Sequence, residues 1–250
     1  MKKPGKKESG FTLLEVIVSF GILAVLVLML ANVFNSASTS YNIANRKMDL
    51  CQNARIVLDQ ISREIKGAII YHNGNRYGFH IRGAGSSGWV SNSVGSEIFF
   101  IAPWEVNTTQ TSDFVEFGYY LDDGPTANAH DNILKRCAVP DNGTVYDYLT
   151  NRNWPSNNTY VDIAYHVRNF TIDWYGSHPS GDSEAWETVE YNPFPPPMAY
   201  KGDRIPRAVR IHIEMLHPDD FTKYGPVGKI EQVTLHFQTV VYLNNSIPFN

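Results

Sequence analysis

The carboxyl group of Glu15 is the chemical group with the most unusual surroundings in this sequence. It lies near the start of an apolar run, and from Val16 to Ala31 the chain is almost continuously apolar. A carboxylate at the centre of a membrane helix costs about 2.5–3.5 kcal/mol on insertion scales. The sequence leaves two interpretations of Glu15: a side chain that only reaches the membrane interface, or an acid that pairs with a partner charge.

Residue types that commonly carry out catalysis form no recognisable pattern in the sequence. It contains no HExxH, HxH or G-x-S-x-G motif, which are the spacings of common metal and nucleophile sites. We expect His166, His212 and His236 to lie on strands as ordinary solvent-facing side chains. The sequence therefore predicts no enzyme, no catalytic or metal-ligating residue, no cofactor and no small-molecule substrate.

The acidic loops and the cysteines each leave a question open. Asp122, Asp123 and Asp131 could offer oxygens to Ca²⁺, but their spacing does not match an EF-hand loop. Cys51 falls on an expected helix and Cys137 on an expected strand, too far apart in the chain for a zinc motif. Outside the cytoplasm they could form a disulfide, adding about 2–4 kcal/mol of stability, or they could stay as two buried thiols.

The charge distribution indicates a protein with one membrane anchor rather than a nucleic-acid-binding protein. The net charge of the 250 residues is −4, so no nucleic acid partner is expected. Phe11 to Ala31 would form about 31 Å of helix, enough to cross a bilayer. Four lysines precede this run, at positions 2, 3, 6 and 7, and they predict that the N-terminus stays in the cytoplasm. The rest of the chain would then lie outside, in the periplasm of a two-membrane cell.

The apolar run continues into a second helical segment with a different pattern. No proline occurs between Pro4 and Pro103, and apolar residues recur at steps of three and four, as on one face of a helix. The sequence predicts one helix from about Phe11 to Lys66, stopped by Gly67. Its second part should pack against another element along one apolar stripe. The expected stripe consists of Ala44, Met48, Cys51, Ala54, Leu58, Ile61 and Ile65.

From residue 68 onward the sequence has the pattern of an antiparallel sheet. Segments rich in β-branched and aromatic residues are separated by Gly-, Asn-, Asp- and Pro-rich clusters. Val209, Ile211 and Ile213 alternate with polar residues, so their strand should bury one face. Because no helices alternate with the strands, the sequence predicts an α+β fold, with the long helix packed on an antiparallel β domain. The expected strands span residues 97–102, 114–121, 133–139, 160–176, 185–191, 207–216 and 229–243.

The segment G-F-T-L-L-E, which contains Gly10, Phe11 and Glu15, follows a basic leader and precedes the apolar helix. This combination resembles the N-terminal signal of type IV prepilins and of type II secretion pseudopilins. The resemblance implies a pilin-like fold, cleavage between Gly10 and Phe11 by a membrane aspartic peptidase, and methylation of the new amino group of Phe11. Glu15 of one subunit would then pair with Phe11 of an adjacent subunit, which offsets the desolvation of both charges and fixes the register of the helices.

The C-terminal half resembles J-type minor pseudopilins and the related W-type minor type IV pilins. Trp174, Trp186 and the strand opening at Pro206–Val209 carry this likeness, together with the helical segment 52–68. The resemblance implies a minor pseudopilin in the tip complex of a type II secretion pseudopilus. A minor type IV pilin for adhesion, motility or DNA uptake is the alternative, and a membrane-anchored periplasmic enzyme or binding protein is a third hypothesis.

The resemblance also implies an organisation for the chain and a set of partners. The expected partners are other minor and major pseudopilins, the prepilin peptidase and the inner-membrane assembly platform. The protein would lie in the bacterial inner membrane, with a single pass and a periplasmic C-terminal domain. Its expected parts are a cleaved leader at 1–10, a membrane and filament-core helix at 11–34, an amphipathic periplasmic half-helix at 35–67 and a β domain at 68–250.

Replacing Gly10 with valine tests the expected cleavage site. Gly10→Val should leave the leader attached, because the peptidase of this family cuts after the glycine. Intact-protein mass spectrometry of the membrane fraction measures the outcome. If the variant is processed like the original chain, cleavage does not occur between Gly10 and Phe11.

Overall fold

The structure is a computed structural model in which the chain forms two compact units, Met1–Asp49 and Leu50–Asn250. Helix α1 (Leu13–Lys66) contributes residues to both. The long N-terminal helix is followed by antiparallel sheets, so the predicted α+β class is confirmed. The structure describes residues 10, 12–69, 72–73, 76–77, 79–82, 93–103, 114–123, 132–140, 160–177, 184–187, 206–224 and 228–243.

Helix α1 begins two residues later than the sequence predicts and ends at the predicted residue. Its last turn carries Arg63 and Lys66, whose positive charges favour the C-terminal end of a helix dipole. The hydrogen bonding then changes to a three-residue spacing, with the amide of Gly67 donating to the carbonyl of Glu64 at 3.1 Å. Among the residues that the structure describes, α1 is long and apolar enough to cross a membrane.

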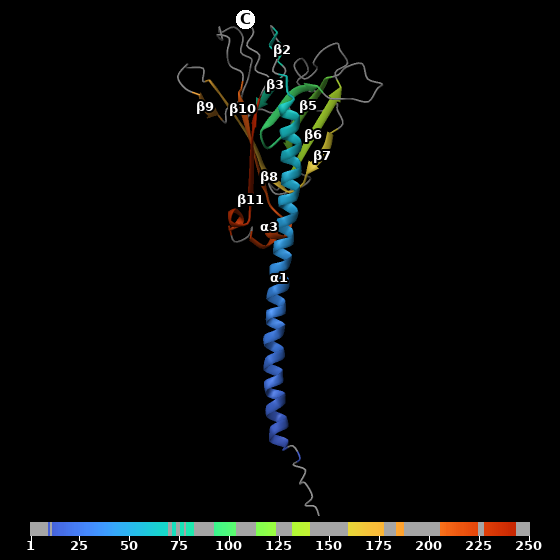
Figure 1. The fold of residues 1–250 in the computed structure, drawn as a ribbon, viewed down its shortest axis with the longest axis vertical. Helices are drawn as coiled ribbons and strands as arrows, with labels where there is room; N and C mark the ends of the chain where they lie inside the picture. Colours follow the sequence, from blue (N-terminus) through green and yellow to red (C-terminus); the bar gives the residue numbers. More distant parts are fainter. Residues whose placement is uncertain are drawn as a thin grey trace, which may run out of the picture. The chain divides into compact units, whose positions relative to one another are not determined.

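A five-stranded antiparallel sheet forms the first layer of the second unit (Figure 1). Its strands follow one another in chain order, and each pairs with the next in an antiparallel register. Such a meander needs only local connections. The strands are β3 (Phe79–Arg82), β4 (Glu97–Pro103), β5 (Phe114–Asp122), β6 (Ile133–Pro140) and β7 (Tyr160–Ala164).

A four-stranded antiparallel sheet with the order β11-β10-β8-β9 forms the second layer. Helix α3 (Pro218–Tyr224) and the 3-10 helix η3 (Ile230–Gln232) lie between β10 and β11 in the chain. Two short strands, β1 (His72–Asn73) and β2 (Arg76–Tyr77), pair with each other. The four strands of the second layer are β8 (Val167–Ser177), β9 (Glu184–Glu187), β10 (Ala208–Met215) and β11 (Leu235–Tyr242).

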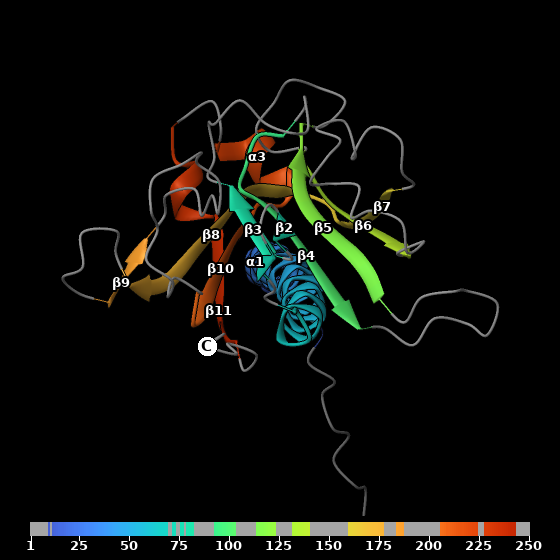
Figure 2. The same ribbon diagram turned by 90° about the horizontal axis from the view of Figure 1, so that it is seen from above.

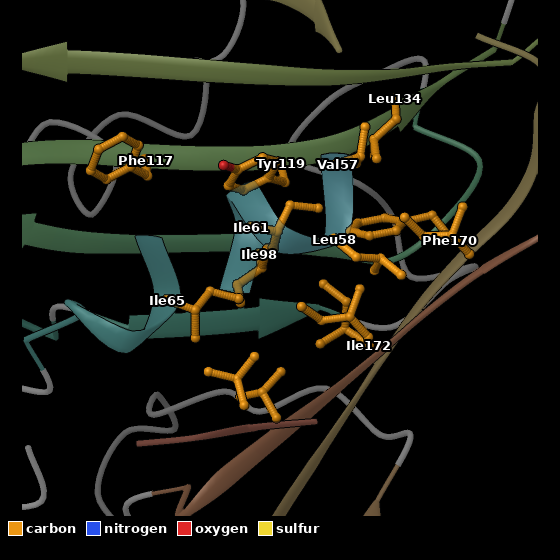
Figure 3. Close-up of a cluster of buried hydrophobic side chains, with 14 of the residues drawn as sticks. Val57, Leu58, Ile61, Ile65, Ile98, Phe117, Tyr119, Leu134, Phe170 and Ile172 are labelled. Atoms are coloured by element: carbon orange, nitrogen blue, oxygen red, sulfur yellow. The ribbon is translucent and has the colours of Figure 1, made fainter. Parts of the chain in front are cut away.

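The last turns of α1 lie between the two sheets, so one helix stripe and two sheet faces share a core (Figure 2). Ile61 and Ile65 are fully buried and contact this core beside Ile98 of β4 and Ile172 of β8 (Figure 3). Burying each such side chain contributes about 1.5–3 kcal/mol. The buried helix residues are Leu50, Ala54, Val57, Leu58, Ile61, Glu64 and Ile65.

The predicted stripe was therefore wrong at its N-terminal end. Ala44, Met48 and Cys51 are exposed, and burial begins at Leu50. Positions spaced by three and four residues in turn match the 3.6 residues of a helical turn only approximately, so a line through them rotates slowly around the helix. Over six turns, the predicted stripe therefore moves off the packed face at one end. The residues that lie deepest, from Ala54 to Ile65, do follow the predicted face.

Two predicted strands are each divided in the structure. The segment 160–176 forms β7 in one sheet and β8 in the other, and the chain changes sheets at Tyr165 and His166. His166 has a φ of 61°, a left-handed conformation that is uncommon for residues other than glycine and occurs mostly outside strands. The segment 229–243 forms η3 and then β11. His166 is therefore a turn residue, not the strand residue that the sequence predicted.

Gly118 lies at the centre of the five-stranded sheet, where a side chain has no room. It is paired with Phe99 of β4 on one side and Cys137 of β6 on the other. A Cβ atom at Gly118 would lie 2.6 Å from the Phe99 ring and 2.7 Å from Cys137 Sγ. The absence of a side chain here lets the large Phe99 ring remain fully buried.

Gly118→Ala should lower the free energy of unfolding by about 1–3 kcal/mol, because the added methyl group overpacks the sheet. Urea unfolding of the full-length chain in non-ionic detergent, followed by tryptophan fluorescence, measures the change. Gly67→Ala is the matched control, since its Cβ would lie no closer than 3.4 Å to another atom. A Gly118→Ala protein as stable as the control would contradict the packing argument.

Candidate functional site

Thr12 and Glu15 are joined by three reciprocal hydrogen bonds at the start of α1. The Thr12 amide and hydroxyl donate to Glu15 Oε2 at 3.0 and 3.1 Å, and the Glu15 amide donates to Thr12 Oγ1 at 3.3 Å. This reciprocal arrangement is a capping box, which satisfies amide groups that lack a partner within the helix. Thr12 is therefore the residue that caps the helix, and Glu15 occupies the third helical position.

The capping box holds the Glu15 carboxylate in a defined orientation at the surface of the chain. The two hydrogen bonds that Thr12 donates to the carboxylate both end on Oε2, and Oε1 accepts no hydrogen bond from the residues that the structure describes. Glu15 and Thr12 are both exposed. One carboxylate oxygen therefore stabilises the helix terminus while the other faces outward, free to accept a donor from another molecule.

The first unit presents an apolar surface on all sides of α1. From Leu13 to Phe34 the large apolar side chains keep 41–80% of their surface exposed. No residue in the most apolar part of the helix is buried against the rest of the chain. Soluble proteins rarely leave so much contiguous apolar surface in water, so this segment needs lipid or other helices around it.

The structure locates the sequence-predicted processing residues only in part. Gly10 is exposed and precedes the helix, as a cleavage site requires. Phe11 and residues 1–9 lie outside the described residues, as does Asp131. Cleavage and methylation therefore stay predictions, and Glu15 has a local partner that the sequence interpretation overlooked, although T-x-x-E before an apolar run is a recognisable capping-box signature.

The comparison with known families addresses this same segment. A family described as "Prokaryotic N-terminal methylation motif" matches residues 5–31. The chain has a prepilin-type N-terminus. This prepilin-type N-terminus contains Gly10, Thr12 and Glu15 and ends inside the exposed apolar part of α1. No curated relative matches the chain.

Two solved structures are similar to this chain at low sequence identity. One is a chain of the GspK-GspI-GspJ complex from the type 2 secretion system of enterotoxigenic Escherichia coli. It is 14% identical, with a TM-score of 0.42 over 77% of this chain and 97% of that chain. The other is a type IV-like pilin from Thermus thermophilus. It is 12% identical, with a TM-score of 0.39 over 79% of this chain and 98% of that chain.

Beyond the prepilin-type N-terminus, a buried charge cluster fastens the C-terminal end of α1 to the five-stranded sheet. The Glu64 side chain is 2% exposed, and Arg136 Nη2 lies 2.9 Å from its Oε1. Arg136 Nε donates to both carboxylate oxygens at 3.1 Å, and the Tyr119 hydroxyl donates to Oε2. The Arg136 guanidinium also lies 5.0 Å from the centre of the Phe117 ring. The cluster thus joins α1, β5 and β6.

Burial and mutual charge set the ionisation of this cluster. Burial, followed by the negative charge of Glu64, holds the pKa of the Tyr119 hydroxyl well above its usual range. Burial alone would lower the pKa of Arg136, but the hydrogen bonds and charge of Glu64 raise it above its ordinary value. Tyr119 therefore stays protonated as a donor, and Arg136 stays charged.

The two cysteines do not form the disulfide that the sequence allowed. Both are free thiols, with Cys51 exposed and Cys137 buried. Cys137 Sγ lies 3.6 Å from the carbonyl of Gly118, to which it donates. Burial raises the pKa of the Cys137 thiol, which makes it a poor nucleophile. The expectation of two buried thiols was also wrong, because Cys51 lies off the packed face of α1.

The strands bring together one set of residues that could hold a metal ion. His212 and Glu214 of β10 and His236 of β11 place one possible ligand atom each within 4.8 Å of one another. The sequence interpretation treated both histidines as ordinary surface residues, since no metal motif joins them. The signal available in the sequence was the alternation of His212 and Glu214 on the wet face of one strand. Asp122, a candidate calcium ligand, instead pairs with Lys135 at 2.6 Å.

Arg136→Met should destabilise the second unit by about 3–5 kcal/mol, because it leaves the Glu64 carboxylate buried without its cation. Adding Glu64→Gln to this variant should recover most of the loss, since the amide carries no charge. Urea unfolding of the full-length chain in non-ionic detergent measures both.

Arg55→Met is the matched control for loss of an arginine from an ion pair. Arg55 pairs with Asp59 at 3.9 Å on the exposed face of α1, so its loss should cost less than about 1 kcal/mol. Equal losses in Arg136→Met and Arg55→Met, or no recovery in the double variant, would contradict the assigned role of the buried pair.

Proposed function

We propose that the protein is a minor pseudopilin of a type II secretion system, a structural subunit at the tip of the periplasmic pseudopilus. The observation that carries the proposal is the prepilin-type N-terminus at the head of a helix with an exposed apolar surface. The C-terminal strand pattern around Trp174, Trp186 and Pro206 supports the branch that contains J-type pseudopilins and W-type minor pilins, without separating the two. A minor type IV pilin is the alternative within the same class.

In this proposal the segment 1–10 is removed and the new amino group on Phe11 is methylated. The product starts with a positive charge close to the Thr12–Glu15 capping box. Oε2 of Glu15 is engaged by its own helix, while Oε1 faces outward and can accept the amino group of a neighbouring subunit. An ion pair that is shielded from water by apolar helices is strong when matched and costly when one charge is left alone.

The proposal assigns a place to each remaining part of the chain. Residues 11–34 lie in the inner membrane before assembly and in the helical core of the filament afterwards. Residues 35–67 and 68–250 form the periplasmic half-helix and the β domain, which contact other minor and major pseudopilins. The prepilin peptidase and the assembly platform act on the chain from the membrane, and the protein itself catalyses no reaction.

A pair of substitutions can separate the charge of Glu15 from its capping role. Glu15→Gln removes the charge but keeps a side chain that closes a capping box. It should abolish incorporation into the filament, because the amino group of the neighbour loses its partner. Thr12→Val keeps the charge and removes the capping hydroxyl, which should cost only about 0.5–2 kcal/mol of local helix stability. Filament incorporation is measured by shearing and immunoblotting, with mass spectrometry to confirm normal leader removal.

The proposal fails if Glu15→Gln assembles and supports secretion as well as the original chain. It also fails if Thr12→Val is as defective as Glu15→Gln, since the capping hydrogen bonds and not the charge would then matter. Co-purification of the full-length protein with minor pseudopilins, as opposed to minor pilins encoded by the same cell, decides between the two subgroups.

A further inference from the structure

We propose that His212, Glu214 and His236 form a binding site for Zn²⁺ that joins β10 to the edge strand β11. The three side chains offer two imidazole nitrogens and one carboxylate oxygen within 4.8 Å of one another. This site is independent of the prepilin-type N-terminus and of the proposed function, and it lies wholly within the second unit.

The strand register brings the three residues to one face of the sheet. Glu214 is paired directly with His236, and His212 is paired with Gln238, so His212 lies diagonally across from His236. The opposite face of β10 is buried through Val209, Ile211 and Ile213, which leaves His212 and Glu214 on the outer face. The backbone of the antiparallel pair thus fixes the spacing of the ligands.

The side chains already lie close to a binding geometry. The rings of His212 and His236 are nearly parallel, with their centres 5.7 Å apart. His236 Nδ1 lies 3.6 Å from Glu214 Oε1. Ligand atoms around a tetrahedral zinc ion lie about 3.4 Å apart, given zinc–ligand distances near 2.1 Å. The Glu214–His236 pair meets that spacing. A rotation of the accessible His212 or His236 side chain brings the remaining ligand atom to the same spacing.

The charges around the cluster are compatible with a bound cation. Arg168 lies near Glu214, but its Nη2 atom is paired with Glu231 at 2.6 Å, so its charge is balanced. Glu231 in turn lies close enough to His236 to interact with it electrostatically. Arg210, two residues before His212, is likewise neutralised by Asp173, with Nε to Oδ2 at 2.7 Å. Both neighbouring arginines therefore have a carboxylate partner other than Glu214.

The donor set selects the class of ion. Two imidazoles and one carboxylate form the ligand set of several zinc sites, whereas Ca²⁺ and Mg²⁺ prefer oxygen ligands alone. Three protein ligands leave a fourth position for water. Because β11 is an edge strand with one neighbour in its sheet, a metal bridge to β10 would hold it in register and stabilise the folded chain by mass action.

Isothermal titration of ZnCl₂ into the untagged full-length chain in non-ionic detergent tests the site. All variants carry Cys51→Ser, because an exposed free thiol binds zinc on its own. We expect one saturable site per chain with a Kd below about 10 µM, together with a higher thermal unfolding midpoint in the presence of zinc. His212→Ala, His236→Ala and the near-isosteric Glu214→Gln should each weaken binding by more than about tenfold.

Gln238→Ala is the matched control, since Gln238 is exposed on β11 opposite His212 and offers no ligand of this class. It should bind zinc like the parent chain and show the same rise in unfolding midpoint. Circular dichroism in the absence of zinc checks that every variant is folded. The proposal is overturned if the parent shows no saturable binding, or if any of the three ligand variants binds zinc as tightly as the parent. A cluster that serves only as a Glu214–His236 ion pair would give that result.

Discussion

The buried ion pair between Glu64 and Arg136 is the interaction on which the second unit depends. A carboxylate in the apolar stripe of α1 has to meet a cation, and Arg136 supplies it from β6 while Tyr119 supplies a hydroxyl from β5. Apolar packing tolerates small sliding movements of a helix, whereas a buried charge pair has few acceptable positions. The cluster therefore fixes the position of α1 along and around its axis within this unit.

The limits of prediction follow from how far apart the partners lie in the chain. The helix, its end at Lys66 and most strands could be predicted, because their patterns are local. Glu64 and Arg136 are separated by 72 residues, and no local pattern pairs them. The division of the segment 160–176 into two strands at His166 could not be predicted from the sequence either. Both halves are rich in strand-forming residues, and only the tertiary structure requires a positive φ at His166.

The candidate sites also differ in how close together their residues lie in the chain, and therefore in whether the sequence could predict them. The T-x-x-E capping box of Thr12 and Glu15 is a local signature, and the prepilin-type N-terminus is a contiguous motif, so both are present in the sequence itself. Bringing His236 to Glu214 requires the register of β10 and β11, two strands that α3 and η3 separate in the chain, so no local motif pairs them. Glu15 shows how a single carboxylate can serve a helix terminus through one oxygen and remain open to a neighbour through the other.

The two cysteines differ in exposure, so one of them can be labelled selectively. Cys51 is exposed beside Leu50, where burial of α1 begins, whereas Cys137 is enclosed within the five-stranded sheet. A thiol-reactive dye or spin label should therefore attach at Cys51 and spare the core, without an engineered cysteine. Such a label sits at the point where α1 passes from an open surface to a packed one, and its spectrum would register any subunit that comes to cover that point.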